Sequence, residues 1–142
     1  MRTVKQLLES KGHDVWGVSP DTSVLEAIKK MADKEVGALL VLDQGKPVGI
    51  VSERDYARKV ILQGRSSEET SVKEIMTTRV VCARPELSVE ECMAIMTDKR
   101  IRHLPVVEGD EVLGMISIGD LVKAIIAEQQ FIINQLERYI AG

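Results

Sequence analysis

The sequence predicts an α+β fold made of two copies of one β-α-β-β-α unit, with a short helix before them and a long helix after them. Three observations support this prediction: a repeat at a spacing of 65 residues, helical periodicity behind capping motifs, and uninterrupted apolar runs joined by short polar turns. Half of the chain is marginal as a folding unit by itself, so we expect the two copies to fold against each other.

Internal repetition is the strongest of these signals, because it needs no gap. Identical residues recur 65 positions apart: Val15 and Val80, Pro20 and Pro85, Ser23 and Ser88, Met31 and Met96, Leu39 and Leu104, and Gly49 and Gly114. The chain is therefore predicted to contain a duplicated structural unit.

Composition places the chain among ordinary globular proteins. Of its 142 residues, 44% are hydrophobic and 29% are charged, and the net charge is −3. An acidic balance argues against non-specific nucleic-acid binding, which needs a basic surface. No apolar run approaches the roughly 20 residues that cross a bilayer. The polar start does not have the pattern of a signal peptide, so we expect a cytoplasmic location.

The two cysteines, Cys82 and Cys92, stand apart from each other and from any cysteine or histidine cluster. Their spacing predicts neither a disulfide scaffold nor a structural zinc site. Cys92 falls in a helical apolar stripe, which favours a buried and inert thiol.

Capping patterns mark the predicted helix starts. Ser or Thr followed three residues later by an acid or an amide occurs at Thr3, Ser23 and Ser88. The first pattern predicts a helix over 3–11. The other two precede apolar residues at helical spacing, and these stripes include Met31 and Met96, which we assign to the core.

Two pairs of apolar runs predict the strands. The runs at 38–42 and 104–107 are each followed by a polar turn, at 43–46 and 108–111, and then by a second apolar run. Such short turns containing glycine are typical of β-hairpins. Continuous apolar strands indicate a sheet that is covered on both faces.

The polar stretch at 63–78 is interpreted as an ordered linker with a turn of helix at 72–76. The predicted divisions are an N-terminal helix at 1–12, a first repeat at 13–64, a linker at 65–78, a second repeat at 79–127 and a C-terminal helix extension at 128–142.

The last predicted helix carries an apolar stripe that is longer than one small unit needs. Ile118, Ile125, Ile132 and Tyr139 recur every seven residues, while Gln129 interrupts a second row. One hypothesis is that a second copy of the chain covers this stripe, giving a homodimer. The alternative is that the helix folds back on its own domain.

A Ser-x-x-Asp motif follows an apolar strand in each repeat, at Ser52 to Asp55 and at Ser117 to Asp120. Two interpretations remain open. The motif is either a capping box that completes a helix start, or a site where the carboxylate accepts hydrogen bonds from a vicinal diol beside the helix N-terminus.

The repeated motifs resemble a known family. They read Pro-Asp-Thr-Ser-Val at 20–24, Met-Thr-Asp-Lys-Arg-Ile-Arg-His-Leu-Pro-Val-Val at 96–107 and Gly-Met-Ile-Ser-Ile-Gly-Asp at 114–120. In this order they resemble the tandem CBS-domain pair, or Bateman module, named after cystathionine β-synthase. The resemblance covers about residues 10 to 127, and stand-alone bacterial and plant CBS-pair proteins look closest.

The resemblance implies two pseudo-symmetric clefts between the repeats that bind an adenosyl ligand such as AMP, ADP, ATP, NAD or S-adenosylmethionine. In that family the Asp of the motif holds the ribose hydroxyls, and the Ser or Thr lies beside ribose or phosphate. These roles carry over to Asp55 with Ser52 and to Asp120 with Ser117.

The resemblance also implies residues for the base and the phosphates. The predicted base-pocket residues are Trp16, Val36, Gly37 and Ala38 together with Asp120, and Val81 and Ile101 together with Asp55. Arg102 and His103 are predicted to reach phosphates, with Arg54 as a further candidate. Because the first repeat has Gly37 and Ala38 in the equivalent positions, two equivalent ligands are not expected.

Some of these residues have a plain structural alternative. Trp16 is as well explained as a core residue as it is by stacking on adenine. His103 is equally compatible with an ordinary surface histidine, and His13, in a polar turn, is assigned no function.

The sequence bears on three classes of function. The first is a regulatory module that binds an adenosyl ligand and signals to a partner protein. An enzyme is disfavoured, because one histidine and two separated aspartates supply no nucleophile with its base. The alternative to regulation is a structural dimerisation protein with vestigial clefts.

Overall fold

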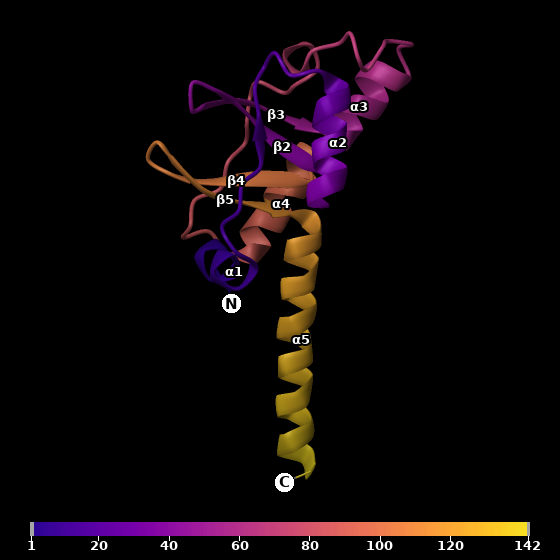
Figure 1. The fold of residues 1–142 in the computed structure, drawn as a ribbon. Coiled ribbons are helices and arrows are strands. Elements are labelled where there is room, and N and C mark those ends of the chain that lie inside the picture. The colour runs from indigo at the N-terminus through magenta and orange to yellow at the C-terminus, as the bar shows by residue number, and fades with distance from the viewer. Residues whose placement is uncertain (1, 142) are drawn as a thin grey trace. The chain divides into compact units, whose positions relative to one another are not determined.

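The chain forms two compact units in a computed structural model that describes residues 2–141 (Figure 1). The first-repeat unit is Val15–Val80. The second-repeat unit joins Met1–Asp14 to Val81–Gly142. The leading helix thus belongs with the second repeat, although the first repeat follows it in the sequence. The predicted α+β fold class is confirmed.

The first-repeat unit is built around a three-stranded sheet of order β1-β2-β3, in which β1 runs parallel to β2 and β3 runs antiparallel to it. Its elements are β1 (Gly17–Val18), α2 (Val24–Lys34), β2 (Ala38–Asp43), β3 (Lys46–Ser52), α3 (Glu53–Tyr56), the π-helical turn η1 (Ala57–Ile61) and the 3-10 turn η2 (Val72–Glu74). Its core includes Met31, which is 2% exposed, and the β2 residues Leu39 and Val41.

The second-repeat unit is built around an antiparallel hairpin. Its elements are α1 (Val4–Lys11), α4 (Val89–Lys99), β4 (His103–Glu108), β5 (Glu111–Ser117) and α5 (Ile118–Ala141). Leu7 and Leu8 of α1 share one core with Met96 of α4 and Leu121 of α5. The predicted core positions of Met31 and Met96 are both confirmed.

Helix starts follow the predicted capping patterns. Thr3 and Ser88 each form a full capping box, in which side chain and backbone bond reciprocally across three residues. Ser23 Oγ accepts a hydrogen bond from the backbone N–H of Glu26 at 3.2 Å. The turn predicted at 72–76 appears as η2 behind Ser71. Local sequence therefore fixes where these helices begin.

Both predicted hairpins are present. Gln44 and Gly45 connect β2 to β3 with φ of 51° and 80°, and positive φ at both central residues is the pattern of a type I′ turn. The turn from β4 to β5 has positive φ at Gly109, 62°. The two turns thus differ in type although they occupy equivalent places.

The first strand of the duplicated unit is reduced in the second repeat, where the sequence predicts a full copy. Ala83 makes a single parallel bridge to Val106, at the position of the Val18 to Val41 pair in β1 and β2. In the first repeat the N–H of Leu40 also donates to the Trp16 carbonyl at 3.0 Å. Pro105 stands 65 positions after Leu40 and has no N–H, so this second bond cannot form.

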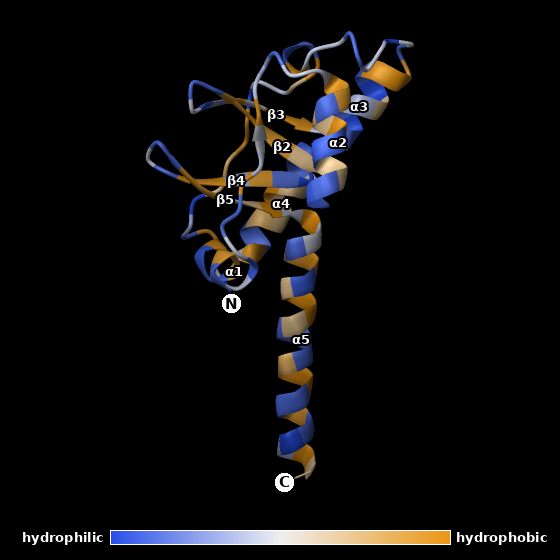
Figure 2. Ribbon diagram, viewed as in Figure 1, coloured by the Kyte–Doolittle hydropathy of each residue, from blue (hydrophilic) through white to orange (hydrophobic). Residues whose placement is uncertain are grey.

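The long helix α5 is packed over its first turns and exposed over its last. Ile118 and Ile125 pack against the core of the second-repeat unit. Farther along, Ile132, Leu136 and Tyr139 are 49%, 56% and 87% exposed. The last turns of α5 extend beyond β4, β5 and α4 (Figure 1) and keep apolar residues among polar ones (Figure 2). The described part of the chain has no helix that is long and apolar enough to span a membrane.

Candidate functional site

The two Ser-x-x-Asp motifs form equivalent helix starts. At the start of α5, the N–H of Ser117 donates to Asp120 Oδ2 at 2.8 Å, and the N–H of Asp120 donates to Ser117 Oγ at 3.2 Å. At the start of α3, the same two bonds join Ser52 and Asp55 at 2.9 and 3.2 Å. Both motifs are therefore capping boxes, as the structural interpretation predicts.

A second backbone bond ties each helix start to the junction between the preceding helix and strand. The N–H of Glu53 donates to the Gly37 carbonyl at 3.0 Å, and the N–H of Ile118 donates to the Arg102 carbonyl at 2.9 Å. Gly37 and Arg102 are two of the predicted ligand residues. Within each unit, the junction and the Ser-x-x-Asp motif are thus held together as one local structure.

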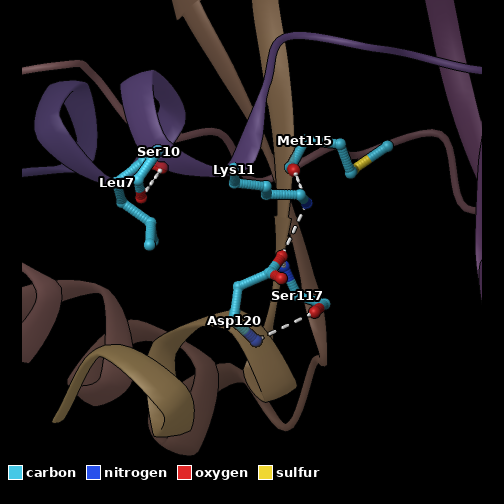
Figure 3. A network of polar contacts seen from close by, with 6 residues as sticks. All are labelled: Leu7, Ser10, Lys11, Met115, Ser117 and Asp120. Carbon is cyan, nitrogen blue, oxygen red and sulfur yellow. Dashed lines mark hydrogen bonds and ion pairs between the residues drawn. The ribbon is translucent and has the colours of Figure 1, made fainter. Parts of the chain in front are cut away.

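Lys11 distinguishes the second motif from the first (Figure 3). Its Nζ lies 2.6 Å from Asp120 Oδ2 and also donates to the carbonyl of Met115. The lysine reaches this position because α1 packs against α5 within the second-repeat unit. The Asp120 side chain remains 21% exposed, so the carboxylate is accessible from solvent while it is held from two sides.

The Asp55 carboxylate has a cation from its own helical segment instead. Lys59 Nζ lies 3.3 Å from Asp55 Oδ1, and the same ammonium donates to the Ile75 carbonyl at 2.8 Å. The Asp55 side chain is 15% exposed. The two aspartates therefore share a cap but differ in the origin of the neighbouring charge.

The surroundings of Asp120 keep it ionised. Burial raises the pKa of this carboxyl, but hydrogen bonds from Lys11 and Ser117 and the positive charge of Lys11 outweigh that effect, so its pKa is lowered. An ionised carboxylate is a hydrogen-bond acceptor only. At neutral pH, Asp120 is therefore suited to receive hydroxyl donors.

His103 lies in the same electrostatic environment. Burial lowers its pKa, and the charges of Lys11 and Arg102 lower it further, while the charge of Asp120 acts in the opposite direction. The imidazole, in β4, is partly buried. His103 is thus a neutral group at physiological pH, placed among charges from α1, α5 and its own junction.

Among the other predicted residues of the first repeat, three belong to its core and Arg54 lies on its surface. Trp16 and Val36 pack against the core, and Ala38 is buried at the start of β2. The Lys34 ammonium lies 4.4 Å from the centre of the Trp16 ring. Arg54 is exposed in the first turn of α3. Their contact with a ligand base or phosphate stays a prediction.

Val81 and Ile101 pack against the core of the second-repeat unit, and Arg102 is exposed. His13, to which no function was assigned, has Nδ1 at 2.8 Å from the Leu113 carbonyl. Cys92 is fully buried, and burial together with the charge of Glu91 raises the pKa of its thiol to about 11. The prediction of an inert Cys92 agrees with this environment.

Sequence reasoning missed Lys11, which forms an ion pair with the Asp120 carboxylate at 2.6 Å. It assigned the helix at 3–11 no role beyond its amphipathic packing. No local signal pairs residues so far apart in the chain, and only the position of α1 reveals the contact. Among residues 2–141, no group of three or more histidine, cysteine or acidic side chains has the arrangement of a metal site.

Comparison with known proteins gives the family. The CBS domain matches twice, at residues 4–61 and 72–127. The chain belongs to the CBS-domain family, and it carries the domain as a tandem pair.

Individual relatives share both the sequence and the fold. The CBS domain-containing protein CBSX3, mitochondrial, from Arabidopsis thaliana is 41% identical over 150 residues, which cover 99% of this chain and 72% of that protein. The structure of a putative signal-transduction protein with CBS domains from Burkholderia ambifaria MC40-6 is 53% identical, has a TM-score of 0.87, and covers 90% of this chain and 96% of its own. Because the plant relative is mitochondrial, the cytoplasmic location stays a prediction.

A further relative was solved with ligands. The CBS domain pair of protein MJ0100, in complex with 5′-methylthioadenosine and S-adenosyl-L-methionine, is 25% identical with a TM-score of 0.79, over 90% of this chain and 98% of its own. Both of those ligands are adenosyl compounds.

Proposed function

We propose that this protein is a regulatory module that binds an adenosyl ligand and signals to a partner protein whether the ligand is bound. The ligand class comprises AMP, ADP, ATP, NAD and S-adenosylmethionine. Family membership supports the proposal, as does the pair of adenosyl compounds bound by the CBS domain pair of MJ0100. The observation that carries it is the Asp120 carboxylate, which is ionised, accessible and fixed at the start of a helix.

The chemistry of a ribose fits this carboxylate. A vicinal diol offers two O–H donors, and an ionised carboxylate accepts both. The cap and Lys11 engage Asp120 Oδ2, while Oδ1 takes no part in those contacts. We assign the ribose hydroxyls to Asp120 with Ser117, and by the same argument to Asp55 with Ser52. The base-pocket and phosphate roles of the other predicted residues are part of this proposal.

Asp120→Asn tests the assignment, because it removes the charge and preserves the size of the side chain. Glu91→Gln is the matched control, since Glu91 occupies the equivalent place in the capping box of α4. Loss of a charge-assisted hydrogen bond, worth about 1.5–3 kcal/mol, weakens ligand binding about tenfold or more. Binding is measured by calorimetry with each adenosyl compound, after native mass spectrometry has identified any nucleotide that co-purifies.

The two variants separate ligand binding from capping. Both are expected to lose roughly 1 kcal/mol of folding stability or less. Only Asp120→Asn should lose ligand affinity and the thermal stabilisation that a bound ligand gives, RT ln(1 + [L]/Kd). Equal affinities of wild type and Asp120→Asn for every adenosyl compound would remove Asp120 from the site.

A structural dimerisation protein is the second candidate, and two observations favour it. Both aspartates are already used in capping boxes, and the last turns of α5 expose a continuous apolar face. We propose that a second copy of the chain covers this face. Apolar residues that recur every seven positions on one helix pack against the same stripe on an identical helix. Dimerisation is compatible with ligand binding. A dimer that no adenosyl compound stabilises would leave dimerisation as the function.

A further inference from the structure

A pocket of about 280 Å³ lies in the second-repeat unit, between α1 and the first turns of α5. Leu7 and Ala124 line it together with five polar or charged residues: Arg2, Ser10, Lys11, Asp120 and Lys123. Three of these side chains are cationic and one is anionic. The pocket therefore has more positive than negative side chains, in a protein whose net charge is negative.

The three cations come from two segments that are remote in the sequence. Arg2 precedes α1, Lys11 ends it, and Lys123 lies near the start of α5. Bringing three like charges to one pocket is unfavourable unless negative charge is nearby. Asp120 supplies one such charge, through its contact with Lys11. The remaining positive charge attracts a further anion.

Arg2 is held in position by its neighbours. Its carbonyl accepts a hydrogen bond from the N–H of Val89 at 3.0 Å, and its Nη2 donates to Ser10 Oγ at 3.3 Å. Ser10 Oγ in turn donates to the Leu7 carbonyl at 3.0 Å (Figure 3). A guanidinium fixed at one nitrogen keeps other N–H groups for an incoming oxyanion.

We propose that this pocket binds a phosphate or diphosphate group through Arg2, Lys11 and Lys123. At about 280 Å³ the pocket is large enough for a phosphate or diphosphate group, and its cationic lining suits an oxyanion. Asp120 belongs both to this pocket and to the proposed ribose site. The inference rests on the proposed function and deepens it: for a ligand whose ribose contacts Asp120, the phosphates enter this pocket, and Arg2, Lys11 and Lys123 replace Arg102 and His103 as their partners.

Calorimetry with pyrophosphate, adenosine and ADP at low ionic strength tests the pocket. The variant is Lys123→Gln, because Lys123 is exposed and its loss leaves the core of α5 intact. Arg138→Gln, near the other end of the same helix, is the matched control. Lys123→Gln should weaken pyrophosphate and ADP by about tenfold, the effect of losing one charge-assisted bond, and leave adenosine unchanged. Raising the salt concentration should reduce the difference.

A second pair of variants examines α1. Lys11→Gln should also weaken pyrophosphate, whereas Lys5→Gln, on the same helix but outside the pocket, should not. Pyrophosphate binding without adenosine or ADP binding would indicate a site for free phosphate and contradict the link between this pocket and an adenosyl ligand.

Two results would contradict phosphate binding in this pocket. One is an ADP affinity equal to that of adenosine together with no binding of pyrophosphate, which leaves the proposed function standing. The other is an unchanged affinity of Lys123→Gln and Lys11→Gln for both pyrophosphate and ADP. If none of the three compounds binds, the pocket fails, and the calorimetry with AMP, ATP, NAD and S-adenosylmethionine decides the proposed function separately.

Discussion

Lys11 determines what Asp120 offers to a ligand. A carboxylate used only for capping would be a structural group. Here the ammonium of Lys11 lies at 2.6 Å, keeps the carboxylate ionised and adds a cation beside it. The cation beside Asp55 is local instead, because its partner Lys59 lies four residues away on the same stretch of helix. The two repeats therefore present different charge arrangements at equivalent positions.

Titration of His103 should make the folding stability of the protein depend on pH. Burial first, and the charges of Lys11 and Arg102 next, lower its pKa in the folded protein below the ordinary value of 6.5. Above pH 6.5 the histidine is neutral in both states, and stability is complete. As the pH falls below 6.5, the unfolded chain binds the proton first, so stability is lost until the lowered folded pKa is reached.

His103→Gln should abolish that part of the pH dependence. Chemical unfolding at a series of pH values between 7.5 and 5.5 should show a steeper loss of unfolding free energy for the wild type than for the variant. The difference in slope is limited to about 1.4 kcal/mol per pH unit for one proton. Parallel curves for the two proteins would contradict the electrostatic account of His103.

Sequence reasoning located the Ser-x-x-Asp motifs because a capping box is a local pattern over four residues. It did not choose between capping and ligand binding, because both use the same residues. It missed Lys11 and Arg2, since their proximity to Asp120 depends on where α1 packs. The same limit applies to His103, whose lowered pKa follows from burial and from the charges of Lys11 and Arg102.

At the scale of elements, α5 is one helix with two environments. Its first turns complete the core of the second-repeat unit through Leu121 and Ala124. Its last turns expose Phe131, Ile132, Leu136 and Ile140. The predicted stripe is thus confirmed as a helix, and the part beyond the core is left uncovered by the described chain, which contradicts the idea that the whole helix folds back on its own domain.

Leu136→Glu should shift a dimer toward monomer, because a carboxylate placed in an apolar helix interface has no partner there. Sedimentation velocity over a range of protein concentrations measures the shift. Asn134→Glu is the control: it adds the same charge about 200° away around the helix, since one residue turns it by about 100°. Equal association of Leu136→Glu and wild type would exclude this face from an interface.

The helices and hairpins could be predicted from the sequence because their signals are short-range: caps, periodicity and turn residues. The reduced first strand of the second repeat was not predicted, although its cause, Pro105 opposite the Leu40 position, is visible in the sequence. The association of α1 with the second repeat needed the structure, because apolar faces do not specify which core they join. The predicted domain boundaries at the linker stay a prediction.

At the scale of the whole molecule, the duplication extends to two glycines that permit close packing. A Cβ at Gly49 would lie 2.7 Å from Met76 Sδ and 2.9 Å from the Thr77 carbonyl oxygen. A Cβ at Gly114 would lie 2.7 Å from Leu8 Cδ2. Equivalent positions in the two repeats thus contact different segments of the chain: two linker residues in the first repeat and the leading helix in the second.

Gly49→Ala should destabilise the protein more than Gly114→Ala. Overpacking costs about 1–3 kcal/mol, and it costs most where the obstructing atom belongs to backbone. At Gly49 the Thr77 carbonyl is itself hydrogen-bonded to Ile50, whereas at Gly114 the end of a leucine side chain is in the way. Denaturant midpoints and slopes of the two variants give the comparison. The reverse order would show that the leucine is the more rigid neighbour.

The second-repeat unit is formed from two separate stretches of the chain, so it can fold only after the second stretch has been synthesised. Val15–Val80 is contiguous, so the ribosome delivers the whole first unit early. Leu7 and Leu8 of α1 emerge before it, yet Gly114, against which Leu8 packs, is made about a hundred residues later. At roughly 5–20 residues per second, the apolar face of the nascent N-terminal helix stays without its native partner for several seconds.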